Sequence, residues 1–179
     1  MFDYISIIFI RFFLNPFTQN TRTEYRYLMN DSKNIVISCP AEEKNKSFGI
    51  PVKKFSNLFP DKTVKILYPE HTIEGYKIIP NDNNGYPKKI KYNLFHLMQS
   101  NNLSQLNNQK FDILIDLDPN INLLNLLLCR QLNPAVRISF DKSESKHFYN
   151  IRYTYNSKKS YSENRSGLYR FLKSMINTK

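Results

Sequence analysis

Short apolar runs rich in β-branched residues recur along the chain, and stretches of helical spacing lie between several of them. The runs have the length and composition of buried strands. The predicted strands cover residues 34–39, 63–68, 76–79, 111–117, 136–140 and 149–155. Because strands that alternate with helices are joined by right-handed crossovers, the joined strands run parallel. The pattern therefore predicts an α/β fold with a mostly parallel sheet.

Helices are expected over residues 48–59, 92–98 and 120–132, and at the carboxyl terminus. Pro51 suits a first helical turn, where a missing N–H is harmless. Asp118 is expected to cap the helix over residues 120–132, with Pro119 at its first position. Ser160 and Glu163 have the spacing of a capping box ahead of the last helix. Helices covering both faces of the sheet predict a three-layer, Rossmann-like domain.

The length of 179 residues suits one domain. We predict a single Rossmann-like domain over residues 34–179, preceded by an apolar amino-terminal segment and a polar connector over residues 1–33. Residues 1–14 are strongly apolar, but a bilayer span needs about 20 residues. A cleaved signal peptide is not expected, because no basic residue precedes the apolar run and no small-residue cleavage site follows it. Two interpretations stay open for residues 1–14: a helix buried on its own domain, or peripheral membrane contact.

The formal net charge is +11, and much of it lies near the carboxyl terminus. From Arg137 to the end, ten Lys or Arg residues stand against three Asp or Glu residues, which leaves +7. Such a bias favours a polyanionic partner, which could be a phosphorylated glycolipid, an anionic membrane or a nucleic acid, and a solvated face explains it as well. Cys39 and Cys129 lie in apolar stretches, which argues against a disulfide framework. A reducing, cytoplasmic location is expected, at the inner face of the membrane if residues 1–14 contact lipid.

Four segments of the chain follow one another in an order and spacing known from an enzyme family. They are NIVISCP (Asn34–Pro40), FGIPVKKFSNLFPDKTVKILYPE (Phe48–Glu70), FDILIDLDP (Phe111–Pro119) and PAVRISFDK (Pro134–Lys142). Over residues 34–153 the chain resembles the amino-terminal lobe of glycosyltransferase family 9, the ADP-heptose:lipopolysaccharide heptosyltransferases. The resemblance implies one lobe of a GT-B glycosyltransferase that works in cell-envelope polysaccharide synthesis. It also implies a phosphorylated glycan or glycolipid as the acceptor.

Two departures from the family leave open whether the chain is an enzyme. Family members place a Gly-Asp pair after their first strand, with the Asp as candidate base, whereas this chain reads PAEEK from Pro40. Glu42 and Glu43 are weak catalytic candidates, because general-base work needs a carboxylate within reach of the acceptor. A solvated acidic pair is the simpler interpretation. The family's second lobe, which holds the nucleotide sugar, has no counterpart in the sequence, so we expect catalysis only together with another glycosyltransferase chain.

Candidate ligand-binding residues gather where the predicted strands end. Ligands of doubly wound sheets bind beyond the carboxyl ends of the strands. Asp118 follows one strand, and the loop after Phe140 follows another. The predicted ligand-binding residues are Asp118, Lys142, Lys146, His147 and Arg152. Of the acidic residues in FDILIDLDP, only Asp118 is expected at this edge, and Arg137 is expected at the opposite end with a structural role.

Several kinds of chemistry are absent from the sequence. With four glycines, the chain has neither a dinucleotide-binding glycine motif nor a Walker motif, and no cofactor is predicted. His71, His96 and His147 lack metal-ligand spacing, so no metal site is predicted. Residues 142–165 interleave basic and aromatic side chains, a mixture that also suits single-stranded nucleic acid. The alternative function is therefore a non-enzymatic basic adaptor that binds RNA or an anionic membrane surface.

Overall fold

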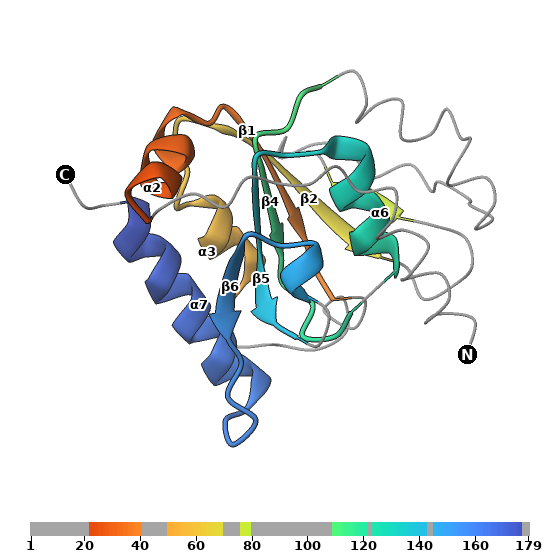
Figure 1. The fold of residues 1–179 in the computed structure, drawn as a ribbon, viewed down its shortest axis with the longest axis vertical. Helices are drawn as coiled ribbons and strands as arrows, with labels where there is room; N and C mark the ends of the chain where they lie inside the picture. Colours follow the sequence, from red (N-terminus) through yellow and green to blue (C-terminus); the bar gives the residue numbers. More distant parts are fainter. Residues whose placement is uncertain are drawn as a thin grey trace.

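The computed structural model describes residues 22–40, 50–69, 76–79, 109–121, 123–142 and 145–176. Its six strands form one sheet in the order β3-β2-β1-β4-β5-β6 (Figure 1). They are β1 Asn34–Ser38, β2 Thr63–Pro69, β3 Tyr76–Ile79, β4 Ile113–Asp116, β5 Val136–Asp141 and β6 Ile151–Thr154. All neighbouring strands pair parallel except the edge strand β3, which runs antiparallel to β2. The predicted α/β class with a mostly parallel sheet is confirmed.

Strands β1 and β4 lie at the centre of the sheet, as their continuous apolar sequences predict. They pair with each other in a register that sets Ile35 opposite Ile113. Their apolar side chains are fully buried. A strand covered on both faces needs apolar residues at successive positions rather than alternate ones, which explains the unbroken runs in both segments.

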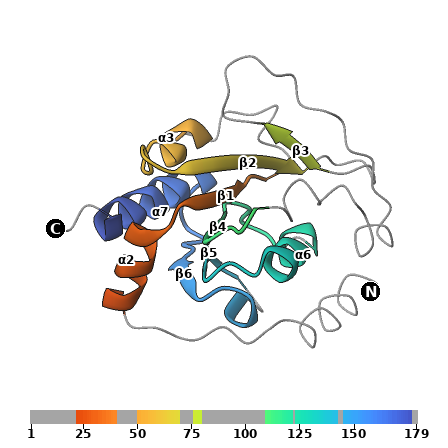
Figure 2. The same ribbon diagram turned by 90° about the horizontal axis from the view of Figure 1, so that it is seen from above.

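Helices cover both faces of the sheet, so the domain has three layers (Figure 2). The helices are α2 Arg22–Asp31, α3 Val52–Ser56, α6 Leu123–Leu132 and α7 Tyr161–Ile176, with a 3₁₀ turn, η2, at Ser145–His147. Helices α2, α3 and α7 pack on one face and share a single apolar core with it. Helix α6 covers the other face. None of these helices has the length and apolarity of a membrane-crossing segment.

The connector expected before β1 is in fact a helix. Residues 22–31 form α2, in which Tyr25 and Met29 lie one turn apart and are buried in the core. Helix α2 contacts α7 and β5. The charged residues around this short apolar stripe hid it in the sequence. Helix α2 therefore packs as part of the domain, although the sequence predicts a connector over these residues.

Helix α6 begins later than the sequence predicts, and Asp118 does not cap it. The helix starts at Leu123, whereas Asp118 Oδ1 accepts a hydrogen bond from the backbone N–H of Asn120, 2.8 Å away. The Asn120 carbonyl accepts a bond from Lys142 Nζ. Both backbone groups of Asn120 are thus used outside the helix. Asn133, with a positive φ of 41°, follows the last residue of α6 in the left-handed conformation common after helices.

The boundaries of α3 also differ from the prediction, whereas the predicted start of α7 is confirmed. Helix α3 is shorter than expected, and Pro51 precedes it as an extended N-cap residue instead of lying in its first turn. The capping box of α7 is confirmed: Glu163 N–H donates to Ser160 Oγ at 3.2 Å, and Ser160 N–H donates to Glu163 Oε2 at 2.8 Å. The helix predicted over residues 92–98, the apolar segment 1–14 and the Glu42–Glu43 pair lie outside the described residues.

The two faces of the sheet differ in chemistry. The face under α2, α3 and α7 is lined by apolar side chains from every parallel strand. Alternate residues of the same strands point to the α6 face, where several polar side chains are buried. These are Ser38 on β1, Asp116 on β4, and Arg137 and Ser139 on β5. Buried polar groups need hydrogen-bond partners, so this face contains a polar network.

Candidate functional site

The chain reverses its direction of winding between β1 and β4. The crossover from β1 to β2 passes through α3 on one face, and the crossover from β4 to β5 passes through α6 on the other (Figure 2). Sheets wound in this way bind ligands outside the carboxyl ends of the two strands at the reversal. Ser38 and Asp116 are paired neighbours at those ends. The candidate site is therefore the edge formed by the ends of β1 and β4.

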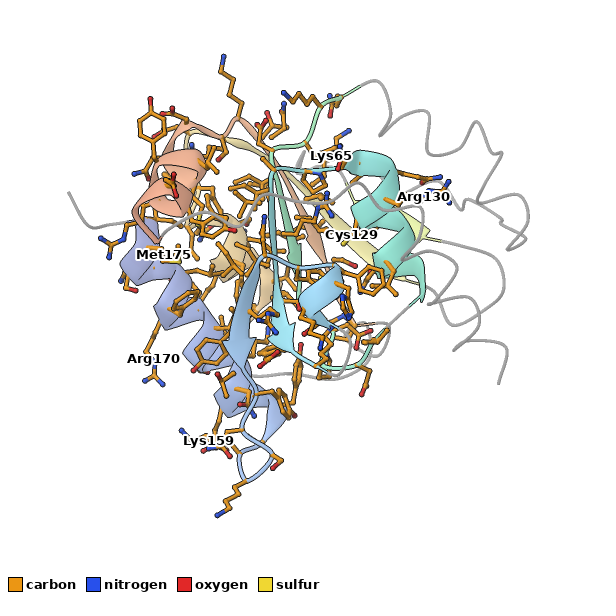
Figure 3. The ribbon with its side chains drawn as sticks, viewed as in Figure 1. Lys65, Cys129, Arg130, Lys159, Arg170 and Met175 are labelled. Carbon is orange, nitrogen blue, oxygen red and sulfur yellow. The ribbon has the colours of Figure 1, made fainter. Side chains whose placement is uncertain are left out.

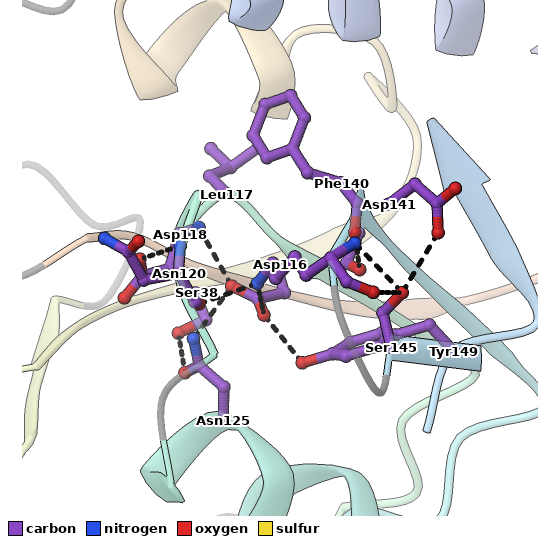
Figure 4. A network of polar contacts seen from close by, with 12 residues as sticks. Ser38, Asp116, Leu117, Asp118, Asn120, Asn125, Phe140, Asp141, Ser145 and Tyr149 are labelled. Atoms are coloured by element: carbon purple, nitrogen blue, oxygen red, sulfur yellow. Dashed lines mark hydrogen bonds and ion pairs between the residues drawn. The ribbon is translucent and has the colours of Figure 1, made fainter. Parts of the chain in front are cut away.

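Asp116 is the centre of this edge (Figure 4). Its side chain is fully buried, and each carboxylate oxygen accepts two hydrogen bonds. Oδ1 accepts the backbone N–H of Asp118 at 2.9 Å and the Asn125 side-chain amide at 2.8 Å. Oδ2 accepts the Lys142 ammonium at 2.9 Å and the Tyr149 hydroxyl at 2.6 Å. One carboxylate thus connects β4, the loop after it, α6, and the segment that follows β5.

Asn125 extends the network from Asp116 to the neighbouring strand. It lies on α6 and is fully buried. While its amide nitrogen donates to Asp116, its carbonyl oxygen accepts the Ser38 hydroxyl at 2.6 Å. The ends of the two central strands are therefore joined through a single helix side chain. A shift of α6 along the sheet would break both hydrogen bonds.

Lys142 supplies the positive charge that balances Asp116. Its side chain is only 5% exposed, and it also donates to the Asn120 carbonyl at 2.9 Å. The ammonium lies 5.6 Å from the centre of the Tyr149 ring. Burial, and then the nearby Asp116 charge, raise the pKa of Tyr149 well above its usual value. The phenol stays protonated and acts as a hydrogen-bond donor to the carboxylate.

The loop that follows β4 is held on both sides of the sheet. Asp118 is buried and shapes the turn through its hydrogen bond to Asn120. The carbonyl of Leu117 accepts the hydroxyl of Tyr161, from the first turn of α7, at 2.6 Å. The loop thus has a defined backbone conformation at the point where a ligand of such a sheet would bind.

The predicted ligand-binding residues separate into two groups. Asp118 and Lys142 lie at the same edge, as a parallel sheet predicts, and both contact Asp116. Lys146 is exposed on η2, His147 beside it is half-buried, and Arg152 is exposed on β6 with Asp141 as its partner at 3.2 Å. Ligand binding by these residues stays a prediction, as does a role for Glu42 and Glu43.

Arg137 lies at the other end of β5, as expected for a structural residue. It is 2% exposed, and its guanidinium donates to the Pro134 carbonyl and to the Asn133 side chain, 3.1 and 2.6 Å away. Burial lowers the pKa of Arg137 below its usual value. Its side chain stabilises the loop between α6 and β5, and because it is buried it contributes little charge to the protein surface.

The sequence points to two members of the network, Asp118 and Lys142, but not to Asp116, Asn125 or Tyr149. The sequence predicts Asp118 rather than Asp116 at this edge, whereas in the structure Asp116 accepts hydrogen bonds from four donors. The available signal was a polar residue inside an apolar run: Asp116 in FDILIDL and Asn125 in LLNLLLC. Such residues are buried together with their neighbours and must find partners there.

A pocket of about 200 Å³ lies at the opposite edge of the sheet, next to the amino ends of β4 and β5. Phe111, Asp112 and Val136 contribute to its wall. The Asp112 carboxylate already accepts the backbone N–H groups of Lys33 and Asn34, at 2.7 and 3.0 Å. Asp112, which shares the pocket wall with Asp31, therefore anchors the start of β1.

The chemistry available at the site is binding and positioning by hydrogen bonds and charge. No group of three His, Cys, Asp or Glu side chains suited to a metal ion occurs in the described parts of the chain. Cys129 lies between α6 and the sheet (Figure 3), where burial raises the pKa of its thiol to about 12. Comparisons of this chain with protein-family models, curated proteins and solved structures found no match.

Proposed function

We propose that this domain binds a phosphorylated glycan or glycolipid at the carboxyl ends of β1 and β4, as the acceptor-side lobe of a heptosyltransferase-like protein. The observation that carries the proposal is the winding reversal at these two strands, with a preorganised loop beside it. The resemblance of the four sequence segments to glycosyltransferase family 9 supports the choice of ligand. Transfer from a nucleotide sugar would then require a second lobe, contributed by another chain or segment.

The contacts of the network suggest different roles for the basic residues Lys142 and Lys146. Lys142 is already paired with Asp116, so its function is to hold the carboxylate and the loop at Asn120. Lys146, exposed on η2, is available to meet a phosphate. Charge-assisted hydrogen bonds of this kind are stronger than neutral ones, and Lys binds phosphate as a point charge. We assign phosphate recognition to Lys146 and support of the loop to Lys142.

The proposal is tested by measuring how the domain binds a phosphorylated lipopolysaccharide core oligosaccharide and its dephosphorylated form. Isothermal titration calorimetry should detect the phosphorylated form with higher affinity. Lys146→Glu should weaken that binding by at least about 1 kcal/mol, the value of one charged hydrogen bond. The control Lys158→Glu makes the same charge change on the connector before α7 and should do much less.

Two results would speak against this function. Equal losses for Lys146→Glu and Lys158→Glu would mean that the protein attracts anions through its net charge alone. Binding of a single-stranded RNA with a steep dependence on salt, without binding of the oligosaccharide, would favour the adaptor function.

A further inference from the structure

The outer side of α7 carries a polar and basic stripe. Ser162, Ser166, Arg170 and Lys173 follow one another at intervals of four, four and three residues, which places them on one side of a helix. Arg170 and Lys173 are exposed, and Arg170 points away from the domain (Figure 3). The opposite side of α7 packs into the core through Leu168 and its neighbours. The stripe therefore faces outwards along the length of the helix.

Further basic residues lie beside this stripe. Helix α3 packs against α7, where the rings of Phe55 and Tyr169 meet edge to face with centres 5.4 Å apart. The exposed basic residues of α3, of the connector before α7 and of α7 itself form what we call the basic layer: Lys53, Lys54, Lys158, Lys159, Arg170 and Lys173. Glu163 is the one acidic residue in these three segments, and it is engaged by Ser160. The layer therefore carries a net positive charge.

The aromatic residues of α7 are partly buried and pack on neighbouring rings. Tyr169 packs on Phe55, and Phe171 packs on Tyr153 with ring centres 5.9 Å apart. Stacking on exposed aromatic rings is what gives single-stranded nucleic acids much of their affinity for proteins. A layer whose exposed groups are ammonium and guanidinium, and whose aromatic rings are partly buried in packing contacts, is better suited to a plane of phosphate groups.

An apolar stretch of sequence precedes α2, the helix that packs against α7. Residues 1–14 read MFDYISIIFIRFFL and precede α2 in the chain. Helix α2 packs against α7, on the face of the sheet that the basic layer covers. Stable attachment to a bilayer usually combines a hydrophobic insertion with basic residues that meet anionic headgroups. The sequence carries both elements, an apolar stretch ahead of α2 and basic residues on the helical face that α2 helps to cover.

We propose that the basic layer of α3, α7 and the connector between β6 and α7 binds the surface of an anionic phospholipid bilayer. Arg170 and Lys173 lie in the carboxyl-terminal half of α7, whereas α7 contacts the strand-end loop through Tyr161 in its first turn, so a lipid surface at Arg170 and Lys173 and the proposed ligand site can be occupied together. Each basic residue near such a surface contributes about a fivefold increase in binding. The attraction weakens with salt, because the charges act through solvent.

The test uses the full chain in a sedimentation assay with neutral phosphatidylcholine vesicles and with vesicles that also contain phosphatidylserine. The protein should bind only the second kind, and less at roughly 300 mM than at roughly 50 mM salt. Arg170→Glu/Lys173→Glu should reduce binding at least about tenfold. The control Lys33→Glu/Lys110→Glu makes the same charge change at exposed residues near the amino ends of the strands, and should reduce binding far less. Far-ultraviolet circular dichroism verifies that both variants remain folded.

Three results would overturn the proposal. The parent chain could fail to bind anionic vesicles, or both double variants could lose binding equally, which would leave only a net-charge effect. The Arg170/Lys173 variant could also keep its vesicle binding while losing RNA binding, which would assign the layer to nucleic acid. Oligosaccharide binding in lipid-free solution, and its loss in Lys146→Glu, report on the strand-end site, so the two proposals fail separately.

Discussion

Removal of the Lys142 charge offers the most direct test of the network at the strand ends. In Lys142→Met, the buried Asp116 carboxylate keeps three neutral donors but loses its counter-charge, 2.9 Å away. Breaking a buried ion pair by removing one partner costs about 3–5 kcal/mol. The Asn120 carbonyl also loses a donor. We therefore expect a loss of about 3–5 kcal/mol in the free energy of unfolding.

The double variant Asp116→Asn/Lys142→Met should be more stable than Lys142→Met. An Asn carbonyl at position 116 can accept from Asp118 and Asn125, while its amide can donate to the Tyr149 hydroxyl. Replacing both charges of a buried pair by neutral groups is often close to neutral in stability. The costs of the single changes should therefore not add, and a double-mutant cycle measures the difference.

Urea denaturation followed by far-ultraviolet circular dichroism measures these changes, since the chain contains no tryptophan. Lys158→Met serves as the control, because Lys158 is exposed and its replacement should change stability by less than about 0.5 kcal/mol. If Lys142→Met lies within about 1 kcal/mol of the parent chain, or if the two single costs simply add, the pair does not stabilise the fold as described.

Three further predictions concern other parts of the fold. Gly167→Ala places a Cβ atom 2.8 Å from Tyr153 Cζ and closer still to its hydroxyl, so it should cost about 1–3 kcal/mol in thermal or urea unfolding, and less in a Tyr153→Phe background. Ser160→Ala should cost about 1 kcal/mol through the lost cap, measured in the same way. Because hydrogen bonds from Ser160 hold the pKa of Glu163 below its usual range, the contribution of this pair is present at neutral pH and is lost as the pH falls through that lowered pKa; the acid-side loss should be smaller in Ser160→Ala. Burial raises the pKa of Cys129 to about 12, so iodoacetamide should label neither buried cysteine in the native protein and both in urea.

The strands of the sheet could be predicted because each is defined by the pattern of residues adjacent in the sequence. The segments that form β1 and β4 contain continuous apolar runs, and β5 has apolar residues at alternate positions. A helical segment lies between β1 and β2 and another between β4 and β5, so a parallel arrangement follows from crossover geometry. The antiparallel direction of β3 could not be predicted in this way, since it depends on a partner strand and not on the pattern of its own four residues. Helix α2 could not be predicted for another reason: among its described side chains, Tyr25 and Met29 alone are buried in the core.

The start of α6 shows how a distant contact can override a local signal. Asp118 followed by Pro119 is a strong helix-start pattern, and nothing within the segment argues against it. Lys142, 22 residues beyond Asn120, binds the Asn120 carbonyl and favours a turn there instead. The local sequence favours a helix start at this point, but it is overridden by the side chain of Lys142, which directly follows β5.

The contacts of Lys142 also change which basic residues of the site are available to bind an anionic ligand. Charge along the sequence assigns Lys142 to ligand binding, whereas its position beside Asp116 makes the pair neutral as a unit. A phosphate could recruit Lys142 only by taking it from a buried carboxylate, which would leave that carboxylate without a counter-charge at a cost of several kcal/mol. An anionic ligand would therefore be attracted by the exposed basic side chains, and Lys146 is the exposed basic residue that follows Lys142 most closely in the sequence. A protein with Lys146 replaced should consequently lose ligand affinity and keep its stability, whereas one with Lys142 replaced should lose stability first.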